Sequence, residues 1–333
     1  MPYTVWGAFK EFREKTVDLD PGTTKVARSS RDYLINQLKA IEKEDWNLPR
    51  LIGSYIPYGS FARSTKIKPL DDIDLLIPLV GTGTTAYQST IDIYEYWLRI
   101  SDSSAPLAIF PDEFNYVNST KILNKIKDSL SEVQKYYKAD VHKSGEAVTL
   151  ELLSYDWVYD IVPAVPIRDG QSGTAYYLIP DGSGDWKRTN PRVDATNVTR
   201  VNGWHNGNFL PAVRLLKYWN GRPIAPKLAS YYFETLALKV FDSASKISDF
   251  PIGVNYFFKY CSLYLWSSCP DPKGLGPPLD DGIDNTTKKK VAEALDEAGK
   301  YSDYALMYER SSEHDKAIYW WQRIFGDKFP KYG

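Results

Sequence analysis

The segment from Gly59 to Leu79, GSFARSTKIKPLDDIDLLIPL, determines how the rest of this 333-residue chain is interpreted. Its end, Asp72 to Leu79, predicts a strand, and alternate side chains of a strand point to the same face. Asp72 and Asp74 therefore project together, while Ile73 faces a core. A divalent cation such as Mg²⁺ relieves the repulsion between two such carboxylates. For an isolated Asp-x-Asp pair, a solvated strand face is the alternative interpretation.

The start of this segment predicts a turn that leads into a short helix, Gly59 to Arg63. Gly59 allows the backbone to approach a phosphate closely, and a helix start offers free N–H groups. The Ser60 hydroxyl adds a further donor. A plain helix cap has the same sequence, so the prediction of a phosphate site depends on the aspartates nearby.

A second segment, VYDIVPAVPI from Val158 to Ile167, places Asp160 on an apolar strand face. A carboxylate is costly to bury there, so Asp160 needs either a basic partner or a metal ion. Together with Asp72 and Asp74 on a neighbouring strand, Asp160 would complete a site for two cations about 3.5–4 Å apart.

The first half of the chain predicts a mixture of helices and strands. A long helix is expected from Thr23 to Lys43, capped by Asp20 or Thr23. Its expected apolar face comprises Val26, Tyr33, Leu34, Leu38 and Ile41. Strands are expected at Leu51–Ile56, Asp72–Leu79, Ala147–Leu153, Trp157–Ile167 and Tyr176–Ile179, and helices at Ile91–Arg99 and Ser119–Lys138.

After Asn190, which can cap a helix with Pro191 at its first position, the pattern becomes helical. The expected helices are Phe209–Trp219, Leu228–Phe241, Asn255–Trp266, Lys288–Tyr308 and Glu313–Phe325. The fold class is therefore α/β (α+β). We divide the chain into a mixed lobe, residues 1–185, and a helical lobe, residues 186–333, with a ligand cleft between them.

Charge and cysteine content limit the possible functions. The 41 Lys and Arg residues balance 42 Asp and Glu residues, for a net charge of −1. A protein that coats nucleic acid carries a basic excess, so we expect small nucleotides as ligands and no constitutive nucleic-acid binding.

Cys261 and Cys269 match no zinc pattern, and a content of two cysteines fits a reducing compartment. With no signal peptide and no apolar run of membrane-spanning length, we expect a cytoplasmic protein without membrane contact.

These motifs resemble the polymerase-beta-like nucleotidyltransferase superfamily, with its Gly-Ser, its Asp-x-Asp and a later third Asp. Within that superfamily the chain is similar to the branch of oligoadenylate synthetase, cyclic GMP–AMP synthase and the bacterial CD-NTases (SMODS domains). The resemblance extends from about Asp20 to Phe325. It implies a nucleotidyltransferase lobe with a mixed sheet, a long N-terminal spine helix at Thr23–Lys43, and a helical C-terminal lobe. The zinc ribbon of cyclic GMP–AMP synthase is absent from the sequence.

The resemblance also implies roles for residues of the helical half. RLLKYWN, residues 214–220, is similar to the family's helix whose lysine holds the triphosphate, which here is Lys217. A surface lysine on an amphipathic helix is the alternative. Ser230 and Tyr231, in LASYYFETL, are similar to the Ser-Tyr that contacts the terminal phosphate and stacks on the donor base. Tyr232 competes for the stacking role, and a core aromatic is a further interpretation of Tyr231.

The activity implied by the resemblance is the joining of nucleoside triphosphates into a cyclic di- or trinucleotide second messenger. Asp72, Asp74 and Asp160 would be both the catalytic residues and the ligands of two Mg²⁺ (or Mn²⁺) ions. The substrates would be ATP, GTP, CTP or UTP, singly or in pairs, and an effector protein of anti-phage defence would bind the product. Some bacterial members are conjugated through their C-terminus, which here would be Gly333.

Two other functions remain open at this point. A template-independent terminal transferase of the CCA-adding or poly(A) type uses the same carboxylates, but its need to hold an RNA end favours a more basic surface. A catalytically silent nucleotide-binding protein would bind nucleotides without turnover.

Overall fold

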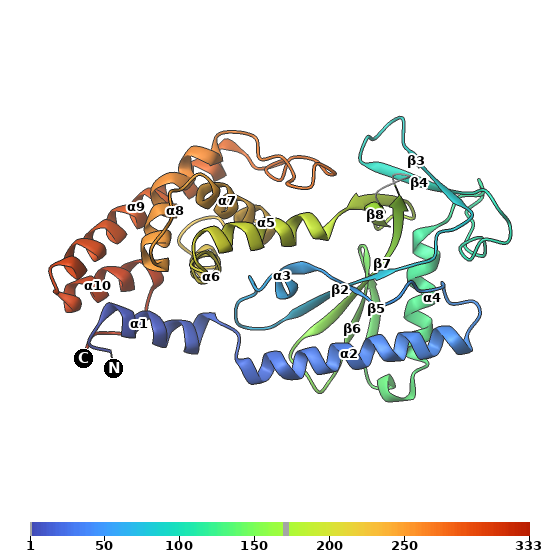
Figure 1. Cartoon of the computed structure of the whole chain (residues 1–333), viewed down its shortest axis with the longest axis horizontal. Helices are drawn as coiled ribbons and strands as arrows, with labels where there is room; N and C mark the ends of the chain where they lie inside the picture. The colour runs from blue at the N-terminus through green and yellow to red at the C-terminus, as the bar shows by residue number, and fades with distance from the viewer. Residues whose placement is uncertain (1, 169–172) are drawn as a thin grey trace.

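The computed structural model describes residues 2–168 and 173–333. Its elements form two groups that lie side by side, a mixed sheet with the helices α2 and α4, and a bundle of the helices α5 to α10 (Figure 1). Both chain termini lie at the end of the bundle that is distant from the sheet (Figure 1).

The sheet is mixed, as the sequence predicts. Its strands follow the order β1-β2-β7-β8-β9-β4-β3, and β6 joins β7 and carries β5 at its other edge. β2 and β7 run parallel, and the other pairs are antiparallel. The strands are β1 (Ile56–Pro57), β2 (Asp72–Pro78), β3 (Thr84–Gln88), β4 (Glu95–Ile100), β5 (Asp140–Ser144), β6 (Ala147–Glu151), β7 (Val158–Arg168), β8 (Thr174–Pro180) and β9 (Trp186–Thr189).

One face of this sheet is covered by two helices. The spine helix α2 (Pro21–Glu44) begins at the N-cap Asp20, whose side chain accepts a hydrogen bond from the Thr23 N–H, as helix starts favour. α4 (Ser119–Ser131) packs beside it in the same core. The buried side chains that the two helices share with β2 are Ala27, Leu34, Leu38, Ile73, Leu75, Ile122, Leu123, Ile126 and Leu130. Asp72 and Asp74 point away from these helices because they alternate with Ile73 and Leu75.

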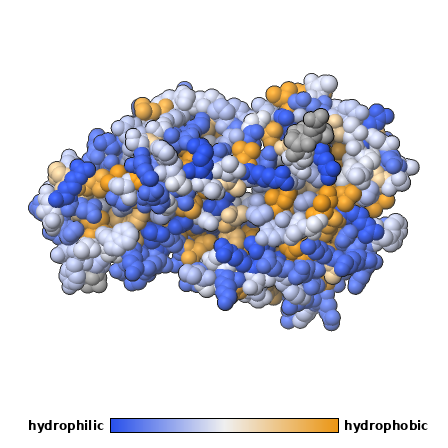
Figure 2. Space-filling view, in the orientation of Figure 1, coloured by the Kyte–Doolittle hydropathy of each residue, from blue (hydrophilic) through white to orange (hydrophobic). Residues whose placement is uncertain are grey.

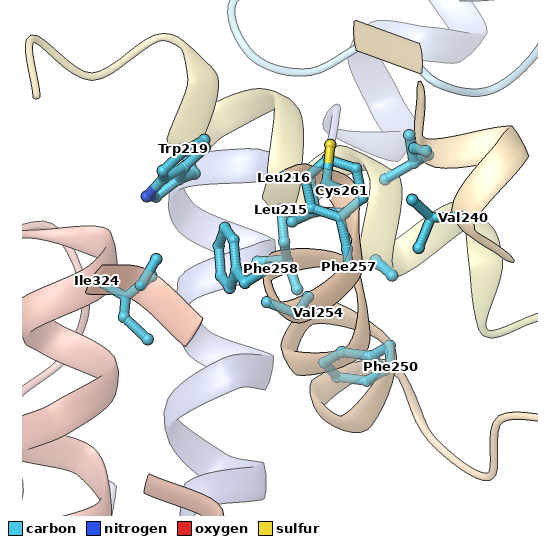
Figure 3. Close-up of a cluster of buried hydrophobic side chains, with 14 of the residues drawn as sticks. Leu215, Leu216, Trp219, Val240, Phe250, Val254, Phe257, Phe258, Cys261 and Ile324 are labelled. Atoms are coloured by element: carbon cyan, nitrogen blue, oxygen red, sulfur yellow. The ribbon is translucent and has the colours of Figure 1, made fainter. Parts of the chain in front are cut away.

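The helical bundle has its own aromatic core. Figure 3 shows side chains of α6 (Phe209–Asn220), α7 (Ser230–Asp242), α8 (Phe250–Leu265) and α10 (His314–Phe325) meeting in it. The remaining bundle helices are α5 (Pro191–Trp204) and α9 (Asn285–Arg310). Phe257 and Phe258 are fully buried there, and Phe258 packs edge-on against Trp219 with the ring centroids 5.0 Å apart.

The first helix of the chain packs against this bundle. α1 (Val5–Phe12) places Phe9 against Trp321, with the ring centroids 4.9 Å apart, and a π-helical turn (Arg13–Val17) leads from it to α2. β9 in turn adds a strand to the sheet after residue 185. The division into residues 1–185 and 186–333 stays a prediction. The packing crosses it twice, because α1 packs on the helical bundle and β9 belongs to the sheet.

Several local predictions were wrong. The helix expected at Ile91–Arg99 is instead strand β4, because Tyr96, Leu98 and Ile100 alternate on a buried face and β4 pairs with β3 and β9. The helix expected at Ser119–Lys138 ends at Ser131. The strand expected at Leu51–Ile56 is reduced to β1 and an isolated bridge between Leu51 and Leu79. Four further elements, α1, β3, β5 and β9, were not predicted from the sequence.

The spine helix also differs in detail from its prediction. Leu34 and Leu38 are buried as expected, but Val26 and Tyr33 are 47% and 37% exposed.

None of the helices in the described part of the chain is both long and apolar enough to cross a membrane.

Candidate active site

The three predicted carboxylates lie on two adjacent parallel strands. Asp74 of β2 is directly in register with Asp160 of β7, and Asp72 lies two residues earlier on β2, on the same face. Thr149 of β6 lies opposite Asp160 and donates a hydrogen bond to its Oδ1 atom at 2.6 Å. The pairing of β2 with β7 therefore brings together groups that are 86 residues apart in sequence (160 − 74).

Crowding and burial change the protonation of these groups. Burial, followed by the charges of Asp72 and Asp160, raises the pKa of Asp74 to about 6. Burial also raises the pKa of Asp160, although the hydrogen bond from Thr149 acts against that shift. Such a cluster favours either protons or added positive charge.

Lys66 supplies positive charge at this place. Its Nζ atom lies 2.8 Å from Asp72 Oδ1 and also bonds to Asp71. Burial lowers the pKa of Lys66, but the hydrogen bonds to Asp71 and Asp72 outweigh burial and raise the pKa on balance. Lys66 was not among the predicted site residues, although it lies within the Gly59–Leu79 segment.

Over residues 2–168 and 173–333, no three His, Cys, Asp or Glu side chains form a preassembled metal-binding group. The donor set of Asp72, Asp74 and Asp160 nevertheless suits Mg²⁺, which takes carboxylate oxygens and keeps part of its coordination sphere for water or phosphate. Lys66 bonds to Oδ1 of Asp72, so a bound cation would share the Asp72 carboxylate with that ammonium group or displace it. The prediction of two metal ions stays a prediction.

Gly59 lies directly against the carboxylates. Its φ angle is +71°, in the region that favours glycine, and a Cβ atom built on it would overlap with the Asp74 carboxylate. Gly59 begins the short helix α3 (Gly59–Ala62), and Ser60 follows it. The Ser60 carbonyl accepts hydrogen bonds from the N–H groups of Thr65 and Lys66, which folds the segment back toward β2.

A cleft of about 650 Å³ joins this cluster to the helical bundle. Its site residues from the sheet side are Ser60, Arg63, Lys66, Asp72 and Asp74, and those from the bundle are Lys217, Lys227, Ser230, Tyr231 and Glu234. Asp160 lies beside Asp74 but does not line the cleft.

A cavity of similar volume, about 640 Å³, lies between α2 and residues 135–155 and contains none of the predicted site residues. The face of the molecule seen in Figure 2 mixes hydrophilic and hydrophobic side chains over both groups of elements.

Lys217 lies at the floor of the cleft, not on an exposed helix surface. Its Nζ atom lies 2.6 Å from Glu234 Oε1, and both residues are buried. Glu234 Oε2 accepts hydrogen bonds from Arg63 Nη2 at 3.1 Å and from Thr65 Oγ1 at 2.9 Å. Burial lowers the pKa of Lys217, and the Glu234 carboxylate opposes that shift. Glu234 therefore holds two cations, Lys217 and Arg63, at the junction of the two lobes.

Glu234 and Arg63 are site residues that the sequence analysis missed. One signal was present: Glu234 follows Ser230 by four positions on a predicted helix, so the two share a face. Arg63 belongs to the site because it bonds to Glu234, which lies 171 residues further along the chain, so no local sequence pattern predicts it.

Tyr231 also lines the cleft, and the Arg63 guanidinium carbon lies 5.7 Å from its ring centroid. Its hydroxyl group donates a hydrogen bond to Asp194 Oδ1 at 2.7 Å and accepts one from Lys273 Nζ at 2.6 Å. Burial and the neighbouring Asp194 carboxylate raise the pKa of Tyr231, so it is a neutral phenol. Ser230 is the exposed first residue of α7. Tyr232 is 1% exposed in the bundle core, which excludes it from stacking on a ligand in the cleft.

Comparison with known proteins places this fold among characterised relatives. No protein-family model matches the chain. The chain is 38% identical over 334 residues to a probable cyclic nucleotide synthase of Bacillus cereus strain VD146, covering 100% of this chain and 99% of that protein. It is 27% identical to the cyclic AMP-AMP-AMP synthase of an Acinetobacter species, covering 97% and 85% of the two chains. The structure of Escherichia coli MS115-1 CdnC with ATP superposes with a TM-score of 0.68 at 18% identity, covering 97% of this chain and 98% of that one.

The fold and its relatives define this protein as a nucleotidyltransferase enzyme. Its likeness to the Bacillus protein extends over the whole chain and includes both lobes. The chain belongs to the bacterial CD-NTase family of cyclic nucleotide synthases.

Proposed function

We propose that this enzyme joins nucleoside triphosphates into a cyclic di- or trinucleotide and releases pyrophosphate. The observation that carries the proposal is the shared cleft. Carboxylates of β2 face it from one lobe, and Lys217, Ser230 and Tyr231 face it from the other. A triphosphate bound across the cleft would place its α-phosphate near the carboxylates and its base near Tyr231.

The residues of the chain have separate tasks in this reaction. Gly59 and Ser60 bind phosphate oxygens through N–H and hydroxyl groups, and Lys217 binds the triphosphate as a point charge. Asp160, which lies beside Asp74 on the adjacent strand, would be the carboxylate nearest the attacking ribose hydroxyl. Bound Mg²⁺ or Mn²⁺, two ions held by Asp72, Asp74 and Asp160, would supply charge neutralisation at the attacking and leaving oxygens.

The bond changes balance without a further reactant. The attacking hydroxyl forms an oxygen–phosphorus bond with the α-phosphate, the bond to pyrophosphate breaks, and the hydroxyl proton is released. Repetition of this step on the linear product, after that product turns in the cleft, closes the ring. ATP, GTP, CTP and UTP are the candidate substrates.

The biological role that we infer is signalling in bacterial anti-phage defence, with a downstream effector that binds the cyclic product. The activity would be cytoplasmic, in keeping with the buried free thiols of Cys261 and Cys269. The membership of the family supports this role.

A further part of the proposal concerns the C-terminal residue, Gly333, as a point of conjugation to another molecule. The Gly333 N–H donates a hydrogen bond to the Pro2 carbonyl at 3.3 Å, and Tyr332 packs edge-on against Tyr3. Conjugation would require these contacts to open. Deletion of residues 331–333 should abolish any conjugate, and an unchanged conjugate would refute this part.

A product assay tests the main proposal. The purified enzyme is incubated with Mg²⁺ or Mn²⁺ and labelled ATP, GTP, CTP and UTP, singly and in pairs, then treated with phosphatase. We expect a small phosphatase-resistant product, identified by mass, that Asp74→Asn abolishes. Label that appears only on added RNA would favour a terminal transferase, and binding of nucleotides without turnover would favour a silent binder.

A further inference from the structure

A threonine hydroxyl on the neighbouring strand holds the Asp160 carboxylate. Thr149 of β6 lies directly opposite Asp160 of β7, and its Oγ1 atom donates a hydrogen bond to Asp160 Oδ1 at 2.6 Å. Strands β2, β7 and β6 are adjacent in the sheet (Figure 1), so Asp74, Asp160 and Thr149 form one row across it. Asp160 therefore has a carboxylate on one side and a hydroxyl group on the other.

This hydroxyl group lies among apolar neighbours. Along β6, Val148 and Leu150 point into the core that the sheet shares with α2 and α4, so Thr149 lies on the carboxylate face. Ala147, two residues earlier on that face, belongs to a small apolar cluster. Thr149 is 6% exposed, and a buried hydroxyl group needs a hydrogen-bond partner, which here is Asp160.

The bond restricts the carboxylate at the place where its orientation matters. The terminal torsion of an aspartate has a broad distribution of angles, so the two oxygens of a free carboxylate exchange places easily. Thr149 fixes Oδ1 of Asp160 on the side of β6 and leaves Oδ2 for a cation. Hydrogen-bonded partners orient metal-binding carboxylates in the same way in other metal sites.

We propose that Thr149 is a positioning residue of the metal site, which fixes the Asp160 carboxylate so that Oδ2 faces the cation shared with Asp72 and Asp74. This role rests on the function proposed above, because that function assigns metal ions to the three carboxylates. Thr149 itself touches neither the metal ion nor the nucleotide. Loss of its hydroxyl group should therefore weaken metal binding only while residue 160 is an aspartate.

Two substitutions at position 149 isolate the hydroxyl group. Thr149→Val replaces it with a methyl group of similar size, so the bond to Asp160 is lost without a cavity. Thr149→Ser keeps the hydroxyl group and removes only the methyl group. Thr85→Val is the matched control, because Thr85 lies on the edge strand β3 and its hydroxyl group bonds to Ser101 Oγ at 2.9 Å.

The experiment measures Mn²⁺ binding to the full chain without nucleotide, from the electron paramagnetic resonance signal of free Mn²⁺. Thr149→Val should weaken Mn²⁺ binding by about 10-fold or more, as loss of a partner behind a metal ligand does. Thr149→Ser and Thr85→Val should keep the affinity of the native chain. Asp160→Asn should weaken binding by itself, and the addition of Thr149→Val to Asp160→Asn should have no further effect.

Thermal unfolding of each variant in EDTA separates this role from a purely structural one. If Thr149→Val loses stability but keeps the native Mn²⁺ affinity, Thr149 does not position the ligand, and the weaker binding of Asp160→Asn would show that the metal site itself is intact. If Thr149→Val weakens binding further in the Asp160→Asn chain, Thr149 acts independently of Asp160 and the proposal is again wrong. If the native chain and Asp160→Asn bind Mn²⁺ equally, the metal assignment of the proposed function fails together with this inference.

Discussion

Gly59 lies so close to Asp74 that a side chain at position 59 would occupy the space of the Asp74 carboxylate. The positive φ angle of Gly59 turns the chain from β1 into α3 at that point, which brings the backbone of the predicted phosphate site against the predicted metal site. The Gly-Ser motif and the Asp-x-Asp motif are therefore one structural unit.

Gly59→Ala should lower product formation by about 100-fold or more, since displacement of a catalytic group by about 1 Å has that effect. It should also cost about 1–2 kcal/mol of stability from the positive φ angle. Gly53→Ala is the matched control, because Gly53 has a φ angle of +64° with no atom within 4 Å of the added Cβ. Gly53→Ala should show the loss of stability in urea unfolding without the loss of product. Equal activity losses in the two variants would contradict the role of the Asp74 contact.

Asp74 should make the stability of the metal-free enzyme depend on pH. Its pKa is about 6 in the folded chain against an ordinary value of 3.8 for an aspartate, so the folded state binds the proton more tightly. The free energy of unfolding should therefore fall as pH rises from about 4 to about 6, by at most about 2–3 kcal/mol, and stay lower above that range.

Asp74→Asn should remove this dependence and stabilise the metal-free enzyme above pH 6, while it abolishes turnover. Urea unfolding of both proteins in EDTA across pH 4–8 measures the difference between them. Mg²⁺ should stabilise the native chain more than the Asn variant. The same pH slope in both proteins would show that Asp74 does not carry the raised pKa.

Glu234 should be more important for stability than the lysine that it binds. Glu234→Gln leaves Lys217 and Arg63 buried beside each other without a carboxylate, so we expect a loss of about 3–5 kcal/mol in urea unfolding. Lys217→Met should cost less, because Glu234 keeps its bonds to Arg63 and Thr65. Glu293→Gln breaks an exposed pair with Lys289 and should change stability by at most about 0.5 kcal/mol. A larger loss for Lys217→Met than for Glu234→Gln would contradict this ranking.

The two adjacent tyrosines of α7 should differ in their effect on nucleotide binding. Tyr231→Ala should weaken nucleotide binding by about 1–3 kcal/mol through loss of base stacking. It should also cost about 1–3 kcal/mol of stability, because Asp194 and Lys273 lose their hydrogen bonds to the Tyr231 hydroxyl. Tyr232→Ala should cost about 3–5 kcal/mol of stability, because its ring fills the bundle core. Calorimetric binding and thermal unfolding measure the two effects.

Tyr232→Phe is the informative control for that pair. Within the described residues the buried Tyr232 hydroxyl has no hydrogen-bond partner, so its removal should leave stability equal or higher. A loss of nucleotide affinity at unchanged stability in Tyr232→Ala would contradict this assignment, because it would show that Tyr232 faces the base.

Elements that depend on local pattern could be located from the sequence alone. The alternation of Asp72 and Asp74 with Ile73 placed the carboxylates on one strand face, and the structure has Ile73 buried on the other. The cap at Asp20 and the helical spacing of Leu34 and Leu38 located the spine helix. Such features depend on neighbours within a few residues, so a single sequence contains them.

Features that depend on distant partners emerge only from the folded chain. The register of Asp74 against Asp160, the ion pairs of Lys66 and Glu234, and the place of Lys273 beside Tyr231 all join segments that the local pattern does not relate. The strand at Glu95–Ile100 was mistaken for a helix because its burial comes from pairing with β3 and β9. Likewise only packing shows which of Tyr231 and Tyr232 faces the cleft, since adjacent helix positions differ by about 100° and helix termini cannot be located to one residue from sequence.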